Sequence, residues 1–301
     1  MKLKLCVLAA ICLIAASVTA ALAVPQQRQM LHSGDDFEGY AIGATVPFYV
    51  DLNGDGLITD DDWQTWGGPT SATGRITEIA SVDGSQAAHL KDDPGLNNTN
   101  NSQIYSNFFT PMNSNVDLLP DKCKTGVHQV TMDIKPMNGT FKINLTNGAG
   151  FTNAYNWCLG LGFGSTTGSG YLPGMSSANI LGLQVTTTSW VDTAVAYVPG
   201  AWYTAKFLVN VDTRTYQVWF GERGGTLAQV NTGWSPWITG ATTPPTTFGG
   251  MLIATSNVKT TNPQQGGGEL YLDNVSYVPE PASMLAVLSL VGLIPALRRR
   301  K

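Results

Sequence analysis

Short runs in which apolar and polar residues alternate fill the middle of the chain, and no long run has the 3.6-residue period of a helix. Alternation with a period of two is typical of strands that bury one face of a sheet. The clearest run is 127–135, where one face would carry His128, Val130, Met132 and Ile134. Further strands are predicted at 141–145, 203–211, 216–220, 251–254 and 270–277.

Gly, Asn, Thr and Pro separate these runs, so polar connections are expected between them. Residues 136–139 predict a hairpin turn, and residues 212–214 predict a second turn. The polar segments 97–107 and 160–170, rich in Gly, Ser, Thr or Asn, predict long loops. Many short strands with polar turns indicate an all-β fold, and we expect one antiparallel β-sandwich of the jelly-roll type.

The first residues are organised like a secretory signal peptide. Lys2 and Lys4 give a charged start, residues 5–16 form an apolar core, and residues 21–23 provide a small-residue cleavage site. This pattern predicts a signal peptide at 1–23, followed by a β-sandwich domain at 24–277.

Three features follow one another at the other end of the chain. Pro279-Glu280-Pro281 precedes an apolar run at 284–297 and a basic end at 298–301. The prolines cannot continue a strand ladder, so they end the domain. The apolar run has 14 residues, fewer than the ~20 of a spanning helix, and the basic end favours the cytoplasm. We therefore expect transient membrane anchoring through this helix.

This C-terminal segment, 278–301, resembles the PEP-CTERM sorting signal of exported bacterial proteins. In that family the signal is cleaved by an exosortase, which passes the protein to the cell surface or extracellular matrix. The resemblance therefore implies an exosortase-type sorting peptidase as a partner. The alternative is an ordinary C-terminal membrane anchor.

The charge of the exported part differs from that of the whole chain, which has 17 Lys+Arg, 21 Asp+Glu and a net charge of −4. Two basic residues lie in the signal peptide and four in the tail, and Glu280 is the one acidic residue removed. This leaves 11 basic and 20 acidic residues, a net charge near −9. No nucleic-acid partner is expected, because such partners require a cationic surface, whereas divalent cations would suit this balance.

Two cysteines remain after processing, Cys123 and Cys158. In an oxidising compartment an even pair predicts one disulfide. It would close a loop of about 35 residues and contribute roughly 3–4 kcal/mol to stability.

The segment 51–62 carries the sharpest chemical signal. Residues with side-chain oxygens fall at positions 1, 3, 5, 9 and 12 of a twelve-residue loop, and Gly56 at position 6 permits left-handed backbone. This is the ligand spacing of an EF-hand, and it predicts one structural Ca2+. The ligands would be Asp51, Asn53, Asp55, Leu57 through its carbonyl, Thr59 and Asp62.

Asp62 stands where the EF-hand has Glu, and with Trp63 and Trp66 the loop resembles that of a dockerin. A dockerin carries two such loops and one is found here, so a structural ion is preferred to a docking role. The alternative is an Asn/Asp-rich turn without metal. Glu38 and Asp273 form a second, weaker metal candidate, for which two exposed acids at strand ends are the preferred interpretation.

Several short segments resemble concanavalin A-like (laminin-G-like) jelly rolls. Residues 36–40 (DFEGY) open the domain, residues 199–202 (PGAW) lead into a strand–turn–strand at 209–220, and residues 272–275 (LDNV) close it. The resemblance implies two curved antiparallel sheets and carbohydrate contact. Galactose-binding-type jelly rolls begin and end in a similar way and are the alternative fold.

The sequence contains no recognisable catalytic motif. The three His residues form no metal-protease pair or triad, and Gly-x-Ser-x-Gly does not occur. A glycosidase needs two facing carboxylates. The Glu-x-Asp-x-x-Glu strand of laminarinase-type enzymes is absent, since Glu78 precedes Ile-Ala-Ser and Asp133 is alone on its strand. We expect a non-catalytic protein, and a hydrolase or lyase with residues assembled in space is the alternative.

Aromatic residues beside polar segments are the candidates for sugar contact, because the C–H groups of a sugar ring stack on flat side chains. Packing is the alternative for each, since Trp is usually largely buried, and Trp190 and Trp202 are assigned to the core. The candidates are Tyr155, Trp157, Trp219, Trp234 and Trp237.

Taken together, these features predict an exported, calcium-stabilised β-sandwich at the cell surface or in the extracellular matrix, associated with polysaccharide. The alternatives are a glycan-active enzyme on the same fold and a purely structural biofilm component.

Overall fold

A computed structural model describes residues 37, 42–43, 64–65, 75–92, 103–107, 125–147, 157–164, 172–240, 245–255 and 267–279. Within these ranges there is no helix long and apolar enough to cross a membrane. The predicted signal peptide at 1–23, the predicted Ca2+ loop at 51–62 and residues 280–301 lie outside the described residues.

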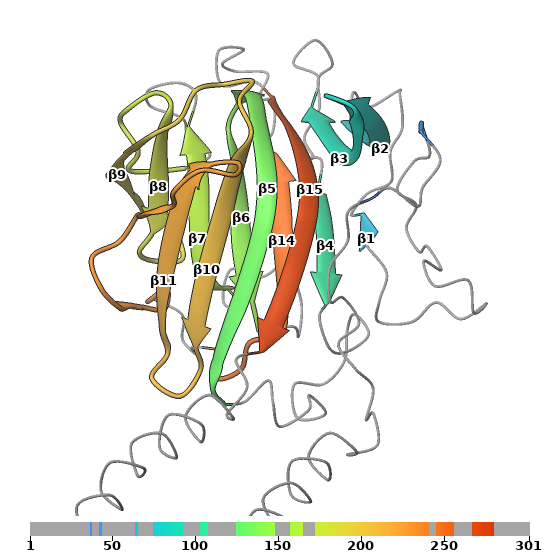
Figure 1. Ribbon diagram of the computed structural model, residues 1–301. Helices are drawn as coiled ribbons and strands as arrows, with labels where there is room; N and C mark the ends of the chain where they lie inside the picture. Colours follow the sequence, from blue (N-terminus) through green and yellow to red (C-terminus); the bar gives the residue numbers. More distant parts are fainter. Residues whose placement is uncertain are drawn as a thin grey trace, which may run out of the picture.

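Two antiparallel sheets make up the described fold (Figure 1). The eight-stranded sheet has the order β12-β11-β10-β5-β15-β3-β2, with β13 also paired to β11. Its strands are β2 (Arg75–Val82), β3 (Ser85–Asp92), β5 (Val127–Gly139), β10 (Tyr203–Asn210), β11 (Thr215–Glu222), β12 (Ala228–Gln229), β13 (Ser235–Pro236) and β15 (Gly268–Pro279).

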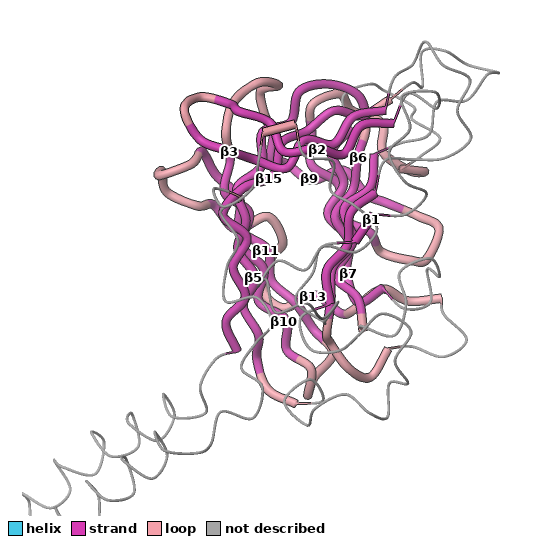
Figure 2. Tube along the Cα trace, turned by 90° about the vertical axis from the view of Figure 1, so that its right-hand side faces the viewer, coloured by secondary structure: helices cyan, strands magenta, loops and turns pink. Residues whose placement is uncertain are grey.

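The seven-stranded sheet has the order β1-β4-β14-β6-β7-β8-β9. The two sheets form separate layers, with β5 and β11 in one and β1 and β7 in the other (Figure 2). The predicted all-β, antiparallel sandwich is therefore confirmed. The strands of this sheet are β1 (Gln64–Thr65), β4 (Gln103–Asn107), β6 (Phe141–Thr146), β7 (Trp157–Gly164), β8 (Ile180–Gln184), β9 (Trp190–Ala196) and β14 (Gly250–Thr255).

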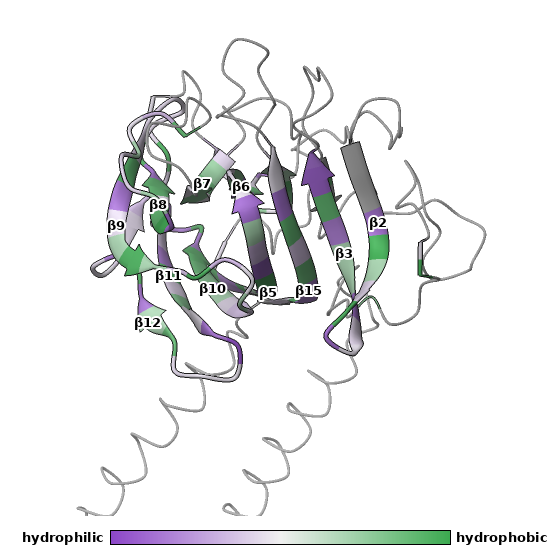
Figure 3. Cartoon of the chain, turned by 90° about the horizontal axis from the view of Figure 1, so that it is seen from above, coloured by the Kyte–Doolittle hydropathy of each residue, from purple (hydrophilic) through white to green (hydrophobic). Residues whose placement is uncertain are grey.

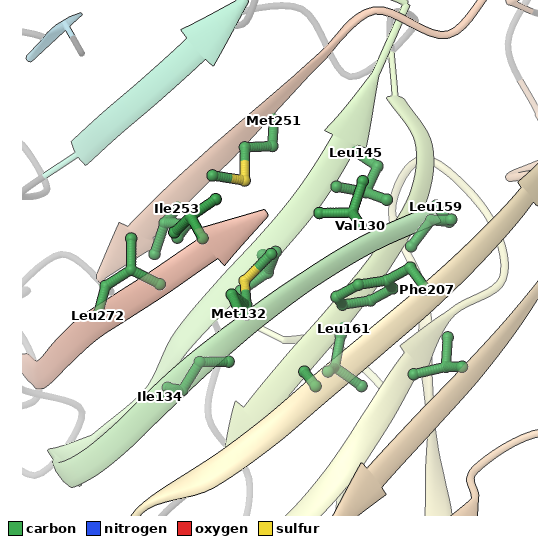
Figure 4. Close-up of a cluster of buried hydrophobic side chains, with 14 of the residues drawn as sticks. Val130, Met132, Ile134, Leu145, Leu159, Leu161, Phe207, Met251, Ile253 and Leu272 are labelled. Carbon is green, nitrogen blue, oxygen red and sulfur yellow. The ribbon is translucent and has the colours of Figure 1, made fainter. Parts of the chain in front are cut away.

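The core lies between the sheets because alternate residues of each strand point inward. In β10, Tyr203, Ala205 and Phe207 are buried, whereas Thr204 and Lys206 between them are only half-buried. Figure 3 shows this alternation as changing hydropathy along β5, β15 and β3. The side chains that meet in the centre include Val130, Met132, Ile134, Leu145, Leu159, Leu161, Phe207, Met251, Ile253 and Leu272 (Figure 4).

The predicted hairpin at 136–139 is wrong. β5 continues through Pro136 to Gly139, and the next strand, β6, belongs to the opposite sheet. The chain changes sheet at Gly139, whose φ of 69° is left-handed, and a Cβ there would lie 1.5 Å from the Gly267 carbonyl oxygen. Polar residues at this point mark a crossing between layers, which local composition does not distinguish from a hairpin.

The predicted loops at 97–107 and 160–170 are wrong in part, because Gln103–Asn107 forms β4 and Trp157–Gly164 forms β7. The glycines of β7 have a packing role on the face turned away from the core. A Cβ at Gly160 would lie 2.8 Å from the Trp190 ring, and one at Gly162 would lie 2.9 Å from it. Residues without side chains thus let Trp190 lie directly against the strand.

Candidate functional site

The outward face of the eight-stranded sheet carries a cluster of charged side chains from β5, β11 and β15. Asp133 and Asp273 are direct cross-strand partners. Arg223, at the end of β11, contacts both: Nε lies 2.9 Å from Asp133 Oδ2, and Nη2 lies 3.1 Å from Asp273 Oδ2. Thr204 on β10 donates a 2.6 Å hydrogen bond to Asp133 Oδ1. One guanidinium therefore holds the two carboxylates together across the strands.

Asn274 completes this Arg223 cluster from a β-bulge in β15. Its φ of 49° is left-handed, a conformation that Asn tolerates better than most residues. Its backbone N–H donates to Asp273 Oδ1 at 2.7 Å, and its side-chain Nδ2 donates to Asp133 Oδ2 at 2.9 Å. The bulge thus aims an amide at the carboxylate pair.

Burial raises the pKa of Asp273, and the hydrogen bond from Asn274 and the charge of Arg223 oppose this rise. Glycoside hydrolysis also uses two facing carboxyl groups, one as acid and one as base or nucleophile. Here, however, Asp273 is only 1% exposed, and both groups are held by Arg223 and Asn274. The arrangement is a closed network, and it links three strands.

A second group extends the network toward the β2–β3 turn. Asp83, in left-handed backbone, accepts hydrogen bonds from Lys135 Nζ at 2.6 Å and Trp202 Nε1 at 2.9 Å. These two hydrogen bonds, chiefly that from Lys135, lower the pKa of Asp83. The Trp202 ring also lies 5.0 Å from the guanidinium carbon of Arg223. Trp202 is therefore half-buried on this outward face, which corrects its assignment to the core.

A third group surrounds His89 on β3. Its ring nitrogens lie 3.4 Å from Glu78 Oε1 and 3.0 Å from Glu269 Oε1. The imidazole stacks on the Tyr271 ring at a centroid distance of 4.5 Å. Burial, with the nearby acids Glu269, Glu78 and Asp83, raises the pKa of Tyr271.

Farther along the same face, Trp219 on β11 lies opposite Lys206 on β10. The Lys206 ammonium is 5.4 Å from the centre of the Trp219 ring, and both side chains are half-buried. Trp219 points outward because its neighbours Val218 and Phe220 fill the core. Of the predicted aromatic candidates, it is the one that stands on this polar face as a strand residue.

The outward face of the seven-stranded sheet contains a different polar group. Lys142 lies over the Trp157 ring at 4.3 Å, and burial lowers its pKa to about 8. Two positions later, the buried Asn144 donates to Gln184 Oε1 at 2.8 Å. Its own amide oxygen has no hydrogen-bond partner among the described residues. Asn144 and Gln184 are thus buried polar side chains on the outward face of this sheet.

Several predicted site residues fall outside the described residues, and their roles stay predictions. They are the six Ca2+ ligands of 51–62, together with Glu38, Cys123, Tyr155, Glu280 and Pro281. Pro279 is the last residue of β15. In the described ranges, no three His, Cys, Asp or Glu side chains are grouped to hold a metal ion, and Asp273 contacts Arg223 instead.

The other aromatic candidates differ in exposure. Trp157 packs in a cluster with Ile238 and Leu252, and Trp237 is 5% exposed within the main core. Packing therefore accounts for both tryptophans, because each is buried among apolar side chains. Trp234 is 44% exposed, on a turn that Asn231 fixes with several hydrogen bonds.

Cys158 is a free thiol with no exposed surface. Cys123 lies outside the described residues, so the disulfide between the two stays a prediction. Cys158 points into the core from β7, and Sγ lies 3.5 Å from the Thr247 carbonyl oxygen. Burial raises the pKa of this thiol.

Sequence reasoning missed the groups around Arg223 and His89. Their members are far apart in the chain, and pairing between strands brings them together. The detectable signal is weak: Asp133 is an acidic residue on the outward side of a long predicted strand, and Asp273-Asn274 interrupts an apolar run. Neither feature predicts which cation lies opposite.

No protein-family model matches the chain, and no curated protein matches it. Solved structures do match. The catalytic domain of a glycoside hydrolase family 131 protein from Coprinopsis cinerea has 15% identity and a TM-score of 0.46, covering 84% of this chain and 95% of its own. The seed lectin of Lotus tetragonolobus has 14% identity and a TM-score of 0.40, with coverages of 72% and 91%.

A sialidase also matches, with 12% identity and a TM-score of 0.44 over 73% of this chain. This chain spans 17% of the sialidase. The similar structures include both an enzyme domain and a lectin, so they do not separate a catalytic from a binding role.

Proposed function

We propose that this is an exported, non-catalytic protein that associates with polysaccharide through the outward face of its eight-stranded sheet. The observation that carries the proposal is Trp219, a strand tryptophan that faces outward beside Lys206 on a polar surface. Its ring offers a flat apolar surface to the C–H groups of a sugar, and the neighbouring polar groups can hydrogen-bond to hydroxyls. Because the ring stands on a strand, the fold fixes its position.

The state of the acidic groups supports binding rather than turnover. Hydrolysis of a glycoside requires one carboxyl group to protonate the leaving group and another to act as base or nucleophile. Asp133 and Asp273 each contact Arg223, and Asp273 has almost no exposed surface. A substrate would have to displace the guanidinium before it reached either carboxylate.

A glycan-active enzyme is the second candidate, and the same pair of facing carboxylates is the observation that favours it. In that case a purified sample would release shorter products from a bound polysaccharide. Replacement of Asp133 by Asn would abolish the release and preserve binding.

Delivery and stabilisation complete the proposal. The leader at 1–23 would direct export, and the tail at 278–301 would anchor the protein transiently until an exosortase-type peptidase releases it to the surface or matrix. The loop 51–62 would bind one Ca2+. Calorimetry at millimolar Ca2+ tests this part, and Asp55→Ala should abolish the binding heat. The same heat in this variant would contradict it.

A glycan array of the purified protein tests the binding role. We expect defined binding that Trp219→Ala weakens at least tenfold. Trp234→Ala, which removes an exposed ring outside the sheet face, serves as the matched control and should leave binding unchanged. Binding lost in the control but retained in Trp219→Ala would move the site to the turn, and silence on the array would favour a purely structural role.

A further inference from the structure

The charges on the outward face of the eight-stranded sheet are mostly paired with one another. Lys135 contacts Asp83 at 2.6 Å, and Lys91 contacts Glu269 at 3.8 Å. Arg223 contacts the Asp133–Asp273 pair. Each of these cations already has a carboxylate partner, so little net positive charge is left on that part of the face.

Lys206 is the exception. No carboxylate of the described chain lies within ion-pair distance of its ammonium, whose one aromatic neighbour is Trp219 at 5.4 Å. That distance is close to the outer limit of about 6 Å for a cation–π contact, so the attraction is weak. A half-buried ammonium on a protein with excess acid thus keeps its charge available to a ligand.

Strand pairing places Lys206 inside a row of binding groups. Trp219 is its partner on β11, Thr131 is its partner on β5, and Ser276 of β15 is in turn the partner of Thr131. Neighbouring strands lie about 4.8 Å apart, so a ring, an ammonium and two hydroxyls occupy successive positions across roughly 14 Å. This row matches the extent of a short stretch of sugar chain.

We propose that the row of Trp219, Lys206 and Thr131 binds an acidic sugar residue, one that carries a carboxylate or a sulfate ester. This inference rests on the proposed polysaccharide association and names the class of ligand. The sugar ring stacks on Trp219, its anionic group pairs with the Lys206 ammonium, and Thr131 hydrogen-bonds to a hydroxyl. A charge-assisted hydrogen bond of this kind is stronger than a neutral one and gives selectivity for the anionic sugar.

The overall negative charge of the exported chain does not oppose this assignment. At physiological ionic strength the Debye length is about 8 Å, so distant acids are largely screened and the local ammonium dominates. On this face, Arg223 offsets one of the two negative charges of Asp133 and Asp273. Selectivity should therefore be confined to this row and should weaken as salt is added.

The test is a titration of the purified protein with matched oligosaccharides at physiological ionic strength. Oligogalacturonate is compared with its carboxyl-reduced, neutral counterpart, and a sulfated galactan oligosaccharide is compared with its desulfated form. These two arms distinguish carboxylate from sulfate. We expect one anionic form to bind about two- to fivefold more tightly than its neutral counterpart, which is the gain expected from one exposed charge pair.

Two variants assign that preference to Lys206. Lys206→Met keeps the length of the side chain and should remove the anionic preference while neutral binding persists. Lys91→Met, which removes a cation already paired on the same face, should retain the preference. Equal binding of anionic and neutral forms by the unmodified protein, or an unchanged preference in Lys206→Met, overturns the inference alone. Failure to bind any of the four oligosaccharides overturns the proposed function with it.

Discussion

Asp133 and Asp273 stand directly opposite each other on β5 and β15, and the guanidinium of Arg223 contacts both carboxylates. Two acids in cross-strand register would repel each other if left alone. Arg223, which directly follows β11, offsets that repulsion and links β5 and β15 to the end of β11. We therefore expect the stability of the sheet to depend on this residue.

Replacement of Arg223 by Ala should destabilise the protein. It leaves two adjacent, buried aspartates without their cation, and we expect a loss of about 2–3 kcal/mol in the free energy of unfolding. Urea denaturation measures the change. Arg214→Ala, at an exposed turn, is the control and should stay within about 0.5 kcal/mol of the unmodified protein. Equal midpoints for the two variants would contradict the role assigned to Arg223.

Lys142 should make stability depend on pH in the alkaline range. Its pKa is about 8 in the folded state and 10.5 in the unfolded chain, so between these values the unfolded state binds more protons. Stability should therefore rise with pH across this window, by about 1–2 kcal/mol between pH 7.5 and 9.5. Above pH 10 ionisation of unfolded tyrosines reverses the trend, because burial raises the pKa of Tyr216 to about 12.

Denaturation at several pH values tests this. Lys142→Met should flatten the rise, while Lys206→Met, which removes a half-buried lysine elsewhere, should retain it. The idea fails if Lys142→Met has the same pH profile as the unmodified protein.

Gly162 should not tolerate a side chain. A Cβ there would lie 2.8 Å from Leu172 and 2.9 Å from Trp190, so Gly162→Ala forces a packed ring to move and should cost about 1–3 kcal/mol. Combining it with Trp190→Leu should be less destabilising than the sum of the single changes, because the smaller side chain removes the clash with Trp190 and leaves the one with Leu172. Thermal or urea unfolding of the four proteins gives the coupling, and strict additivity would argue against the contact.

Cys158 should resist thiol reagents in the folded protein. Its thiol is buried and its pKa is raised, so thiolate, the reactive form, is scarce and inaccessible. Mass spectrometry after treatment with iodoacetamide should find Cys158 unmodified under native conditions and alkylated in guanidinium. Rapid native labelling, or recovery of a Cys123–Cys158 disulfide from the native protein, would show that the thiol is not held as described.

The strands were predictable where alternate residues are buried, because this alternation gives the sequence a period of two. Val130, Met132 and Ile134, and likewise Tyr203, Ala205 and Phe207, are buried as their alternation predicts. β7 was missed because its outward positions are Gly160, Gly162 and Gly164, a composition typical of loops that here accommodates Trp190. The residue that explains these glycines, Trp190, lies more than 25 residues away in the sequence.

The candidate site was predictable only in part. Trp219 could be assigned outward from its two apolar neighbours on the strand. The contacts of Arg223 with Asp133 and Asp273 could not be foreseen, because they depend on the order of strands β11, β10, β5 and β15 in the sheet. Local composition predicts strands but does not order them, and strand order decides which charges meet.

β15 lies inside the eight-stranded sheet, between β5 and β3, and it runs as far as Pro279. A force applied through that residue would pull the strand along its own axis. The hydrogen bonds to β5 span the length of the strand and would then be loaded together in shear, instead of opening one after another as at a peeled edge. If the domain were attached to its surroundings through Pro279, β15 would therefore resist being pulled out of the sheet by that attachment.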